Sequence, residues 1–105
     1  MHTIDTDRTP ISYEAITVSS TAVGFSEGEK NPTTGLGKGQ QVKEIFATVE
    51  TDQIRYTVDG TTPTDAVGHL VSAGQSISIK NVNAIQNFEM IRVTTDASVK
   101  ITYFI

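Results

Sequence analysis

The residues of this chain that could carry chemistry are few, and their spacing matches no catalytic or metal-binding pattern. The chain has two histidines and no cysteine, which excludes disulfides, thiolate nucleophiles and cysteine-built metal sites. Neither His2 nor His69 has a serine or a paired carboxylate at a recognisable spacing, and we expect His69 to be a packed or partly buried strand residue. Asp5 and Asp7 offer two carboxylates, but a calcium loop needs more oxygen ligands at set positions. We therefore expect a protein that is not an enzyme and that uses no metal or cofactor.

A glycine-rich run superficially suggests a phosphate-binding loop. Within it, Pro32 stands where a P-loop has its first glycine, and Gly39 stands where the serine or threonine belongs. As a dinucleotide fingerprint the run also fails, because Gln40 replaces the third glycine and no strand and helix flank it. The run is better interpreted as a flexible loop.

The composition indicates which elements must position any functional residue. Isoleucine, valine and threonine together supply 37 of the 105 residues, against two leucines, and this balance favours strands over helices. The length is that of one domain. A net charge of −4 argues against nucleic-acid binding, which needs clustered lysine and arginine. The chain shows no signal peptide and no apolar run long enough to span a membrane, so we expect synthesis in the cytoplasm and no membrane contact.

Short segments of alternating polarity, separated by turn residues, run from residue 15 to the end of the chain. Ile16 and Val18 alternate with polar residues in the first such segment, over 15–22. We expect further strands at 45–49, 54–58, 69–71, 76–80, 88–94 and 98–105, and at most a helix of one or two turns within 81–87. The strands at 45–49 and 54–58 are expected to form a hairpin, and those at 88–94 and 98–105 a last pair. The pattern predicts an all-β fold, a single Ig-like or jelly-roll-like β-sandwich of about seven to eight short, mostly antiparallel strands.

Two segments do not fit the sandwich pattern. Residues 1–14 carry few apolar side chains and are predicted to form an extended N-terminal arm, which leaves 15–105 as the sandwich domain. Residues 24–41 hold five of the eight glycines and are predicted to form a long flexible loop. Either segment is suited to binding, because an arm can add hydrogen bonds to a neighbour's sheet edge and a loop can order on contact. The alternative is that both are merely disordered surface.

The C-terminal segment constrains the architecture. Val99, Ile101, Tyr103 and Ile105 alternate on one face, with Phe104 on the other. An exposed apolar strand of this kind invites aggregation, so it should be either a central strand of the sheet or covered by another subunit.

Two resemblances to known families can be stated from particular residues. The sequence from Ile54 to Thr64, IRYTVDGTTPT, resembles the tyrosine strand and Asp-Gly-Thr-x-Pro-Thr turn of Ig-like accessory modules, such as the C-terminal domain of chitobiase-type enzymes. A longer stretch, from about Ile45 to Tyr103, resembles small virion-associated proteins encoded in the structural modules of tailed phages. It includes Ala47–Tyr56 and the closing Val99–Tyr103.

The second resemblance implies a non-enzymatic structural protein of a tailed-phage virion, a capsid decoration or cement protein that binds and stabilises the assembled shell. Its implied partners are the major capsid protein or other virion subunits, and a homo-oligomer is expected. Alternatives are a head-to-tail connector or tail component, or a carbohydrate-binding or adhesive module. The resemblance covers neither the arm nor the loop. From their placement alone, the candidate contact residues are Ile4, Arg8, Ile11, Tyr13, Leu36 and Lys38.

Overall fold

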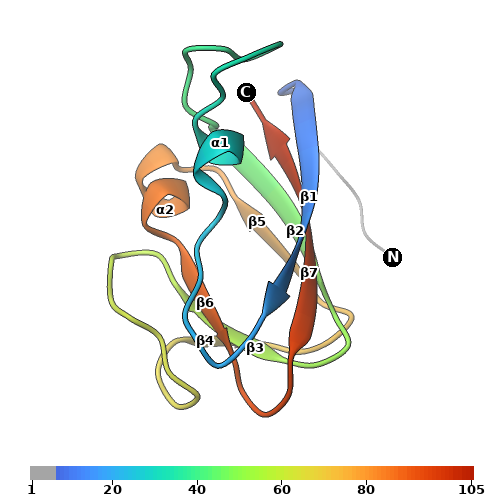
Figure 1. Cartoon of the computed structure of the whole chain (residues 1–105), viewed down its shortest axis with the longest axis vertical. Coiled ribbons are helices and arrows are strands. Elements are labelled where there is room, and N and C mark those ends of the chain that lie inside the picture. Colours follow the sequence, from blue (N-terminus) through green and yellow to red (C-terminus); the bar gives the residue numbers. More distant parts are fainter. Residues whose placement is uncertain (1–6) are drawn as a thin grey trace.

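Two antiparallel sheets packed face to face make up the fold, as Figure 1 shows for the computed structural model, which describes residues 7–105. Sheet A has the strand order β1-β7-β2-β5, and sheet B has the order β4-β3-β6. The strands are β1 (Pro10–Val18), β2 (Glu44–Glu50), β3 (Ile54–Thr57), β4 (His69–Val71), β5 (Ser76–Ile79), β6 (Glu89–Arg92) and β7 (Ala97–Phe104). The predicted all-β sandwich is therefore confirmed, with seven strands in the described part of the chain.

The core lies between the two sheets and is built from every second residue of the strands. In β7, for example, Val99, Ile101 and Tyr103 are fully buried while Ser98, Lys100 and Thr102 between them are only partly buried. This alternation is what a strand with one face on the core produces. The buried apolar residues are Val18, Phe25, Val42, Ile45, Ala47, Val49, Ile54, Val71, Ile77, Ile85, Phe88, Met90, Ala97, Val99, Ile101, Tyr103 and Phe104.

Aromatic rings close one part of this core. Phe25 stacks on Phe88 with ring centroids 4.2 Å apart, and Phe88 also stacks on Tyr56 at 5.3 Å. Tyr103 meets Phe25 edge to face at 5.7 Å. Aromatic pairs prefer these offset and edge-on arrangements, so the four rings join both sheets and the segment after β1 into one packed unit.

Both predicted strand pairs in the second half of the chain are wrong. The turn at Thr51 and Asp52 exists, but it leads from β2 in sheet A to β3 in sheet B, and the turn before Ala97 leads from β6 in sheet B to β7 in sheet A. Each is a corner that crosses the sandwich. Alternating polarity shows which side of a strand is buried, but an inward-facing strand packs equally well in either sheet, so the pattern could not separate a hairpin from a corner.

The first strand begins earlier than predicted. Pro10 to Glu14, assigned to the arm, belong to β1, and Thr9 exchanges backbone hydrogen bonds with Ile105 at 3.1 and 3.0 Å. Proline is tolerated at the first residue of an edge strand, which explains why Pro10 does not interrupt the pairing. The strand ends at Val18, short of the predicted residue 22.

The C-terminal strand is central. β7 lies between β1 and β2, and pairs with both over most of its length. This confirms the first of the two expectations for the segment, because its backbone groups are satisfied within the chain's own sheet. Burial of Tyr103 and Phe104 then removes the aggregation hazard that their exposure would create.

Two short helices, α1 (Glu27–Lys30) and α2 (Val82–Asn87), connect strands. The expected helix within 81–87 is confirmed as α2. The Asn81 side chain accepts a hydrogen bond of 3.0 Å from the backbone N–H of Ala84, the usual N-cap arrangement. Over residues 7–105, neither helix has the length and apolar character needed to cross a membrane.

Candidate functional site

The candidate contact residues fall into two groups in the structure. Ile4 lies outside the described residues. The other five are Arg8 just before β1, Ile11 and Tyr13 within β1, and Leu36 and Lys38 in the loop after α1. Figure 1 shows the start of β1, α1, the loop after it and the C-terminus gathered at one end of the long axis of the molecule. The structure therefore brings together two segments that were predicted separately.

The loop after α1 is built from tight turns. The Val42 N–H donates to the Lys30 carbonyl at 3.0 Å, which closes the base of the loop. Within it, the Gly39 N–H donates to the Pro32 carbonyl at 3.0 Å, and the Lys38 N–H donates to the Gly35 carbonyl at 3.2 Å. The predicted loop of residues 24–41 thus contains α1 and has its own hydrogen-bonded frame, while its flexibility stays a prediction.

Gly37 anchors this loop against the sandwich. Its φ is +88°, and a Cβ atom there would lie 3.2 Å from the Ile11 Cδ1 and 3.3 Å from the Ile105 Cγ2. Only glycine combines that backbone conformation with such a close approach. Ile11 is therefore a partly buried residue of β1 that packs on the core and holds the loop, and it is not a free anchor on an arm.

A small cavity, which we call the loop cavity, lies between β1 and the loop. Its volume is about 190 Å³. The lining residues are Ile11, Ser12, Gly28, Glu29, Pro32, Thr33, Thr34 and Leu36. Ile11 and Leu36 are the two candidate contact residues that meet here, so the arm and the loop form one surface feature.

Two large side chains near this cavity are left in solvent. Tyr13 is 60% exposed and Leu36 is 64% exposed. Tyr13 pairs with Thr102 across the sheet, so it stands on the outer face of sheet A. Lys38 is also exposed, in the same turn as Leu36. Isolated exposed apolar residues are ordinary, but Tyr13 lies on the edge strand β1 and Leu36 lines the cavity beside it, so both stay candidates for contact with a partner.

Arg8 has a role within the fold. Its Nε lies 3.7 Å from the Glu44 Oε1, and Glu44 is only 3% exposed. A buried carboxylate needs a charged or hydrogen-bonding partner, and Arg8 supplies one. Arg8 thus fastens the segment before β1 to β2, which sequence spacing gave no means of predicting.

Glu14 was missed by the sequence reasoning, although it connects three elements. The Tyr103 hydroxyl donates to its carboxylate, and so do the Ser26 N–H at 3.2 Å and the Ser26 hydroxyl at 2.6 Å. Burial raises the pKa of the Tyr103 phenol far above its ordinary value, and the hydrogen bond to Glu14 adds to the rise. No sequence signal marks this pair, because its members are 89 residues apart.

The raised pKa of Tyr103 predicts a loss of stability in alkaline solution. The unfolded chain releases the phenol proton near pH 10, whereas the folded chain retains it. The contribution of Tyr103 is therefore constant below about pH 10, and above it the free energy of unfolding should fall by about 1.4 kcal/mol per pH unit. Urea unfolding at a series of pH values would measure this slope. Tyr103→Phe has no phenol proton to release, so the part of the slope that Tyr103 contributes should be absent from that variant. An unchanged slope in Tyr103→Phe would contradict the assignment of the slope to Tyr103.

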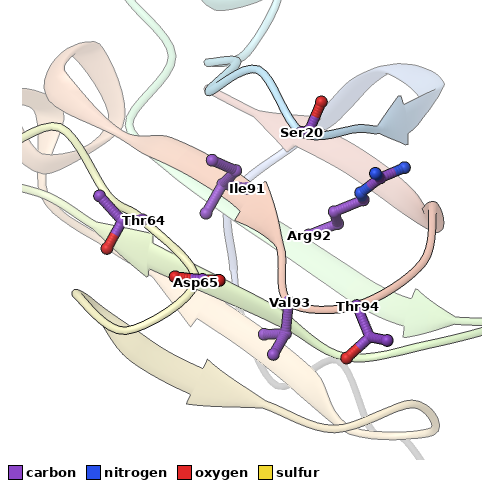
Figure 2. Close-up of a pocket in the computed structure, with 7 residues that line it drawn as sticks. All are labelled: Ser20, Thr64, Asp65, Ile91, Arg92, Val93 and Thr94. Atoms are coloured by element: carbon purple, nitrogen blue, oxygen red, sulfur yellow. The ribbon is translucent and has the colours of Figure 1, made fainter.

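A second, larger cavity lies toward the other end of the molecule, and we call it the distal cavity. Its volume is about 320 Å³. Figure 2 shows its lining, in which Ile91 and Val93 lie between the loop that carries Asp65 and the Arg92 side chain, which points away from Asp65. The complete lining is Ser20, Thr64, Asp65, Ile91, Arg92, Val93 and Thr94.

The wall of the distal cavity that carries Asp65 is held in place by Arg55. The Arg55 Nε donates to the Asp65 carbonyl at 3.0 Å, and one terminal nitrogen donates to the Gly68 carbonyl at 2.9 Å. Gly68 has a φ of +122°, and a Cβ there would lie 3.0 Å from the Tyr56 carbonyl oxygen. These contacts fix the 59–68 segment against β3, so this wall of the cavity is preformed.

Side chains that could together hold a metal ion are not clustered in the described part of the chain. Residues 7–105 contain no group of three or more histidine, aspartate or glutamate side chains that could hold a metal ion. His69, expected to be packed or partly buried, is exposed on β4, with its ring 5.4 Å from that of Tyr56. β4 is an edge strand of only three residues, which leaves His69 too close to the rim of the sandwich to be covered.

Comparisons with known proteins identify no relative of this chain. A scan against protein-family models, a search of curated proteins and a search of solved structures each return no match to this chain. The candidate contact surface therefore rests on the geometry of residues 7–105, and the resemblance to virion proteins stays an expectation.

Proposed function

We propose that this chain is a non-enzymatic structural protein of a tailed-phage particle, and that it binds the assembled shell as a decoration or cement protein. The virion role comes from the resemblance of residues 45–103 to small virion-associated proteins. The structure supports the more general part of the proposal, a protein that docks on a neighbour, through the end of the molecule where β1 and the loop after α1 meet.

The docking role rests on a single observation, which is that β1 is an edge strand. Within residues 7–105, β1 lies at the edge of sheet A and pairs with β7 alone. It is nine residues long, and Glu14 is its one charged residue. A long edge strand presents backbone N–H and C=O groups to any strand that approaches, unless charges or a covering segment protect it. β1 is thus suited to accept a strand from a neighbouring protein.

Side chains on both sides of β1 would add to such a contact. Tyr13 projects from the outer face of sheet A, while Leu36 and the loop cavity lie on the side of the loop. Tyrosine and other large side chains supply most of the binding energy at protein interfaces when a partner removes them from water. Repeated over a symmetric shell, even weak contacts of this kind give firm attachment through avidity.

Cosedimentation tests the proposal. Labelled full-length chain would be mixed with purified particles of the phage that encodes it, and the particles would be pelleted. We expect the chain to sediment with the particles, to saturate at a fixed number of copies per particle, and to be displaced by unlabelled chain. If the labelled chain stays in the supernatant at every ratio, the proposed function is wrong.

A further inference from the structure

The distal cavity has the chemistry of a site for a lysine side chain. Asp65 places a carboxylate at its wall, and no residue in the described part of the chain donates a hydrogen bond to that carboxylate. Ser20 and Thr94 also line the cavity. Ile91 and Val93 supply an apolar floor. A lysine needs both features, because its ammonium group carries three donors while its four-carbon stem packs against apolar surface.

Arg92, the positively charged residue that lines the cavity, does not repel a lysine side chain bound there. Arg92 forms an ion pair with Asp96, four residues along the chain, and donates a hydrogen bond to the same carboxylate. Figure 2 shows its side chain directed away from Asp65. The charge facing the cavity from the 59–68 segment is therefore the carboxylate of Asp65. Because Arg55 holds the backbone of Asp65 in place, little ordering is needed before a ligand binds.

The same chain presents a matching side chain at its opposite end. Lys38 is exposed in the tight turn of the loop after α1, and in residues 7–105 its ammonium group has no hydrogen-bond or ion-pair partner. Leu36, two residues earlier, is 64% exposed. The turn thus presents an apolar side chain that fits the apolar floor of the distal cavity and a cationic side chain that fits the carboxylate on its wall. By contrast, Lys30 and Lys100 are already in ion pairs with Glu27 and Glu50. Lys43 and Lys80 are exposed and in no ion pair within residues 7–105, but neither has an exposed large apolar residue within two positions in the sequence.

The geometry of the assembly follows from the relative position of the loop that carries Lys38 and the distal cavity. The loop lies at one end of the longest axis, which spans 37 Å, and the turn after β6 lies at the other. A single molecule cannot place its own Lys38 in its own distal cavity. Because the two surfaces lie at opposite ends, a head-to-tail contact leaves one loop and one cavity free for further copies, so it can extend into rings or open chains.

We infer that copies of this chain associate head to tail, with the Leu36 and Lys38 turn of one copy inserted into the distal cavity of the next. Lys38 pairs with Asp65 of the neighbouring copy, and Leu36 covers Ile91 and Val93. This inference rests on the proposed function in one respect: it assigns Leu36 of the loop to contact with a neighbouring copy in place of the shell. β1 and Tyr13 remain available for the shell.

Charge exchange tests the inference on the full chain. Sedimentation velocity over a concentration series would measure self-association without any particles. We expect the wild-type chain to associate, and expect Lys38→Glu and Asp65→Lys each to weaken the association by about tenfold or more. An equimolar mixture of the two variants should associate again, because each variant then meets a complementary charge at both contacts. Lys80→Glu is the matched control for Lys38→Glu, because it reverses the charge of another exposed lysine outside the loop and the distal cavity, and it should associate like the wild type.

Three outcomes would overturn the inference: a wild-type chain that stays monomeric throughout, variants that associate as well as the wild type, or a mixture that associates no better than either variant alone. Circular dichroism of each variant would establish that it is folded. Failure of this inference is separable from failure of the proposed function, because self-association is measured without particles and shell binding is measured with them.

Discussion

Replacing Tyr103 with alanine should remove a large share of the folding stability of this chain. Tyr103 is fully buried on the central strand β7, where its ring packs on Phe25 and its hydroxyl donates to Glu14. Truncating a large buried aromatic residue costs about 3–5 kcal/mol, and a domain of this size has a total of about 5–15 kcal/mol. Urea unfolding followed by circular dichroism would measure the change as a lower midpoint.

Two further variants serve as comparisons for the loss of stability in Tyr103→Ala. Tyr103→Phe keeps the ring and removes only the hydrogen bond to the Glu14 carboxylate, so it should cost about 1–2 kcal/mol. Tyr13→Ala truncates a tyrosine that is 60% exposed and should change the free energy of unfolding by less than about 0.5 kcal/mol. Equal effects of Tyr103→Ala and Tyr13→Ala would contradict the placement of β7 at the centre of sheet A.

Gly24→Ala should be the second most damaging substitution that we consider. A Cβ atom at Gly24 would lie 2.7 Å from the Phe88 carbonyl oxygen, which is a backbone atom and cannot rotate away. Next to it, Val23 and Met90 exchange backbone hydrogen bonds of 2.9 and 2.8 Å that join the segment after β1 to β6. Relieving the clash would pull this bridge apart, so we expect a loss of about 1–3 kcal/mol in urea unfolding.

Gly28→Ala is the matched control for Gly24→Ala. Gly28 lies in α1, and a Cβ atom there would have no neighbour within 4 Å. Alanine is favoured over glycine inside a helix, so this substitution should leave stability unchanged or raise it by up to about 1 kcal/mol. If both glycine variants behave alike, the close approach between Gly24 and Phe88 is not what fixes this segment.

The sequence predicted those parts of the fold that depend on local pattern. Alternating polarity and β-branched residues revealed the strands, and the run from Val99 to Tyr103 showed by its apolar alternation that it needs cover on its inner face. Asn81 ahead of a short helical segment is likewise a local signal. Each of these rests on residues close together in the chain, where the periodicity of side chains is directly visible.

The predictions that were wrong depend on contacts between residues that are far apart in the sequence. Whether β2 and β3 form a hairpin or a corner is decided by which sheet buries each strand, and their polarity pattern is the same in both cases. The predicted arm, residues 1–14, extends too far because that segment carries few apolar residues, whereas in the structure Ile11 packs against Gly37 and the hydrophobic core. The distal cavity likewise requires Asp65 and Ile91 to meet, and no spacing in the sequence connects them.

The candidate site was predicted in outline and corrected in detail. Tyr13, Leu36 and Lys38 are exposed, so they remain candidates for contact with a partner. Ile11 and Arg8 instead hold the loop and the start of β1 to the sandwich. Exposure and burial depend on the tertiary packing of the loop, which local composition does not encode.

Particle binding by two matched variants tests the docking role most directly. Tyr13→Asp places a charge on the outer face of sheet A beside the edge strand, whereas Leu70→Asp places the same charge on β4 of sheet B, where Leu70 is 49% exposed. In the cosedimentation assay, we expect Tyr13→Asp to weaken binding to the particles by about tenfold or more and Leu70→Asp to bind like the wild type. Full binding by Tyr13→Asp, or loss of binding confined to Leu70→Asp, would contradict docking through β1.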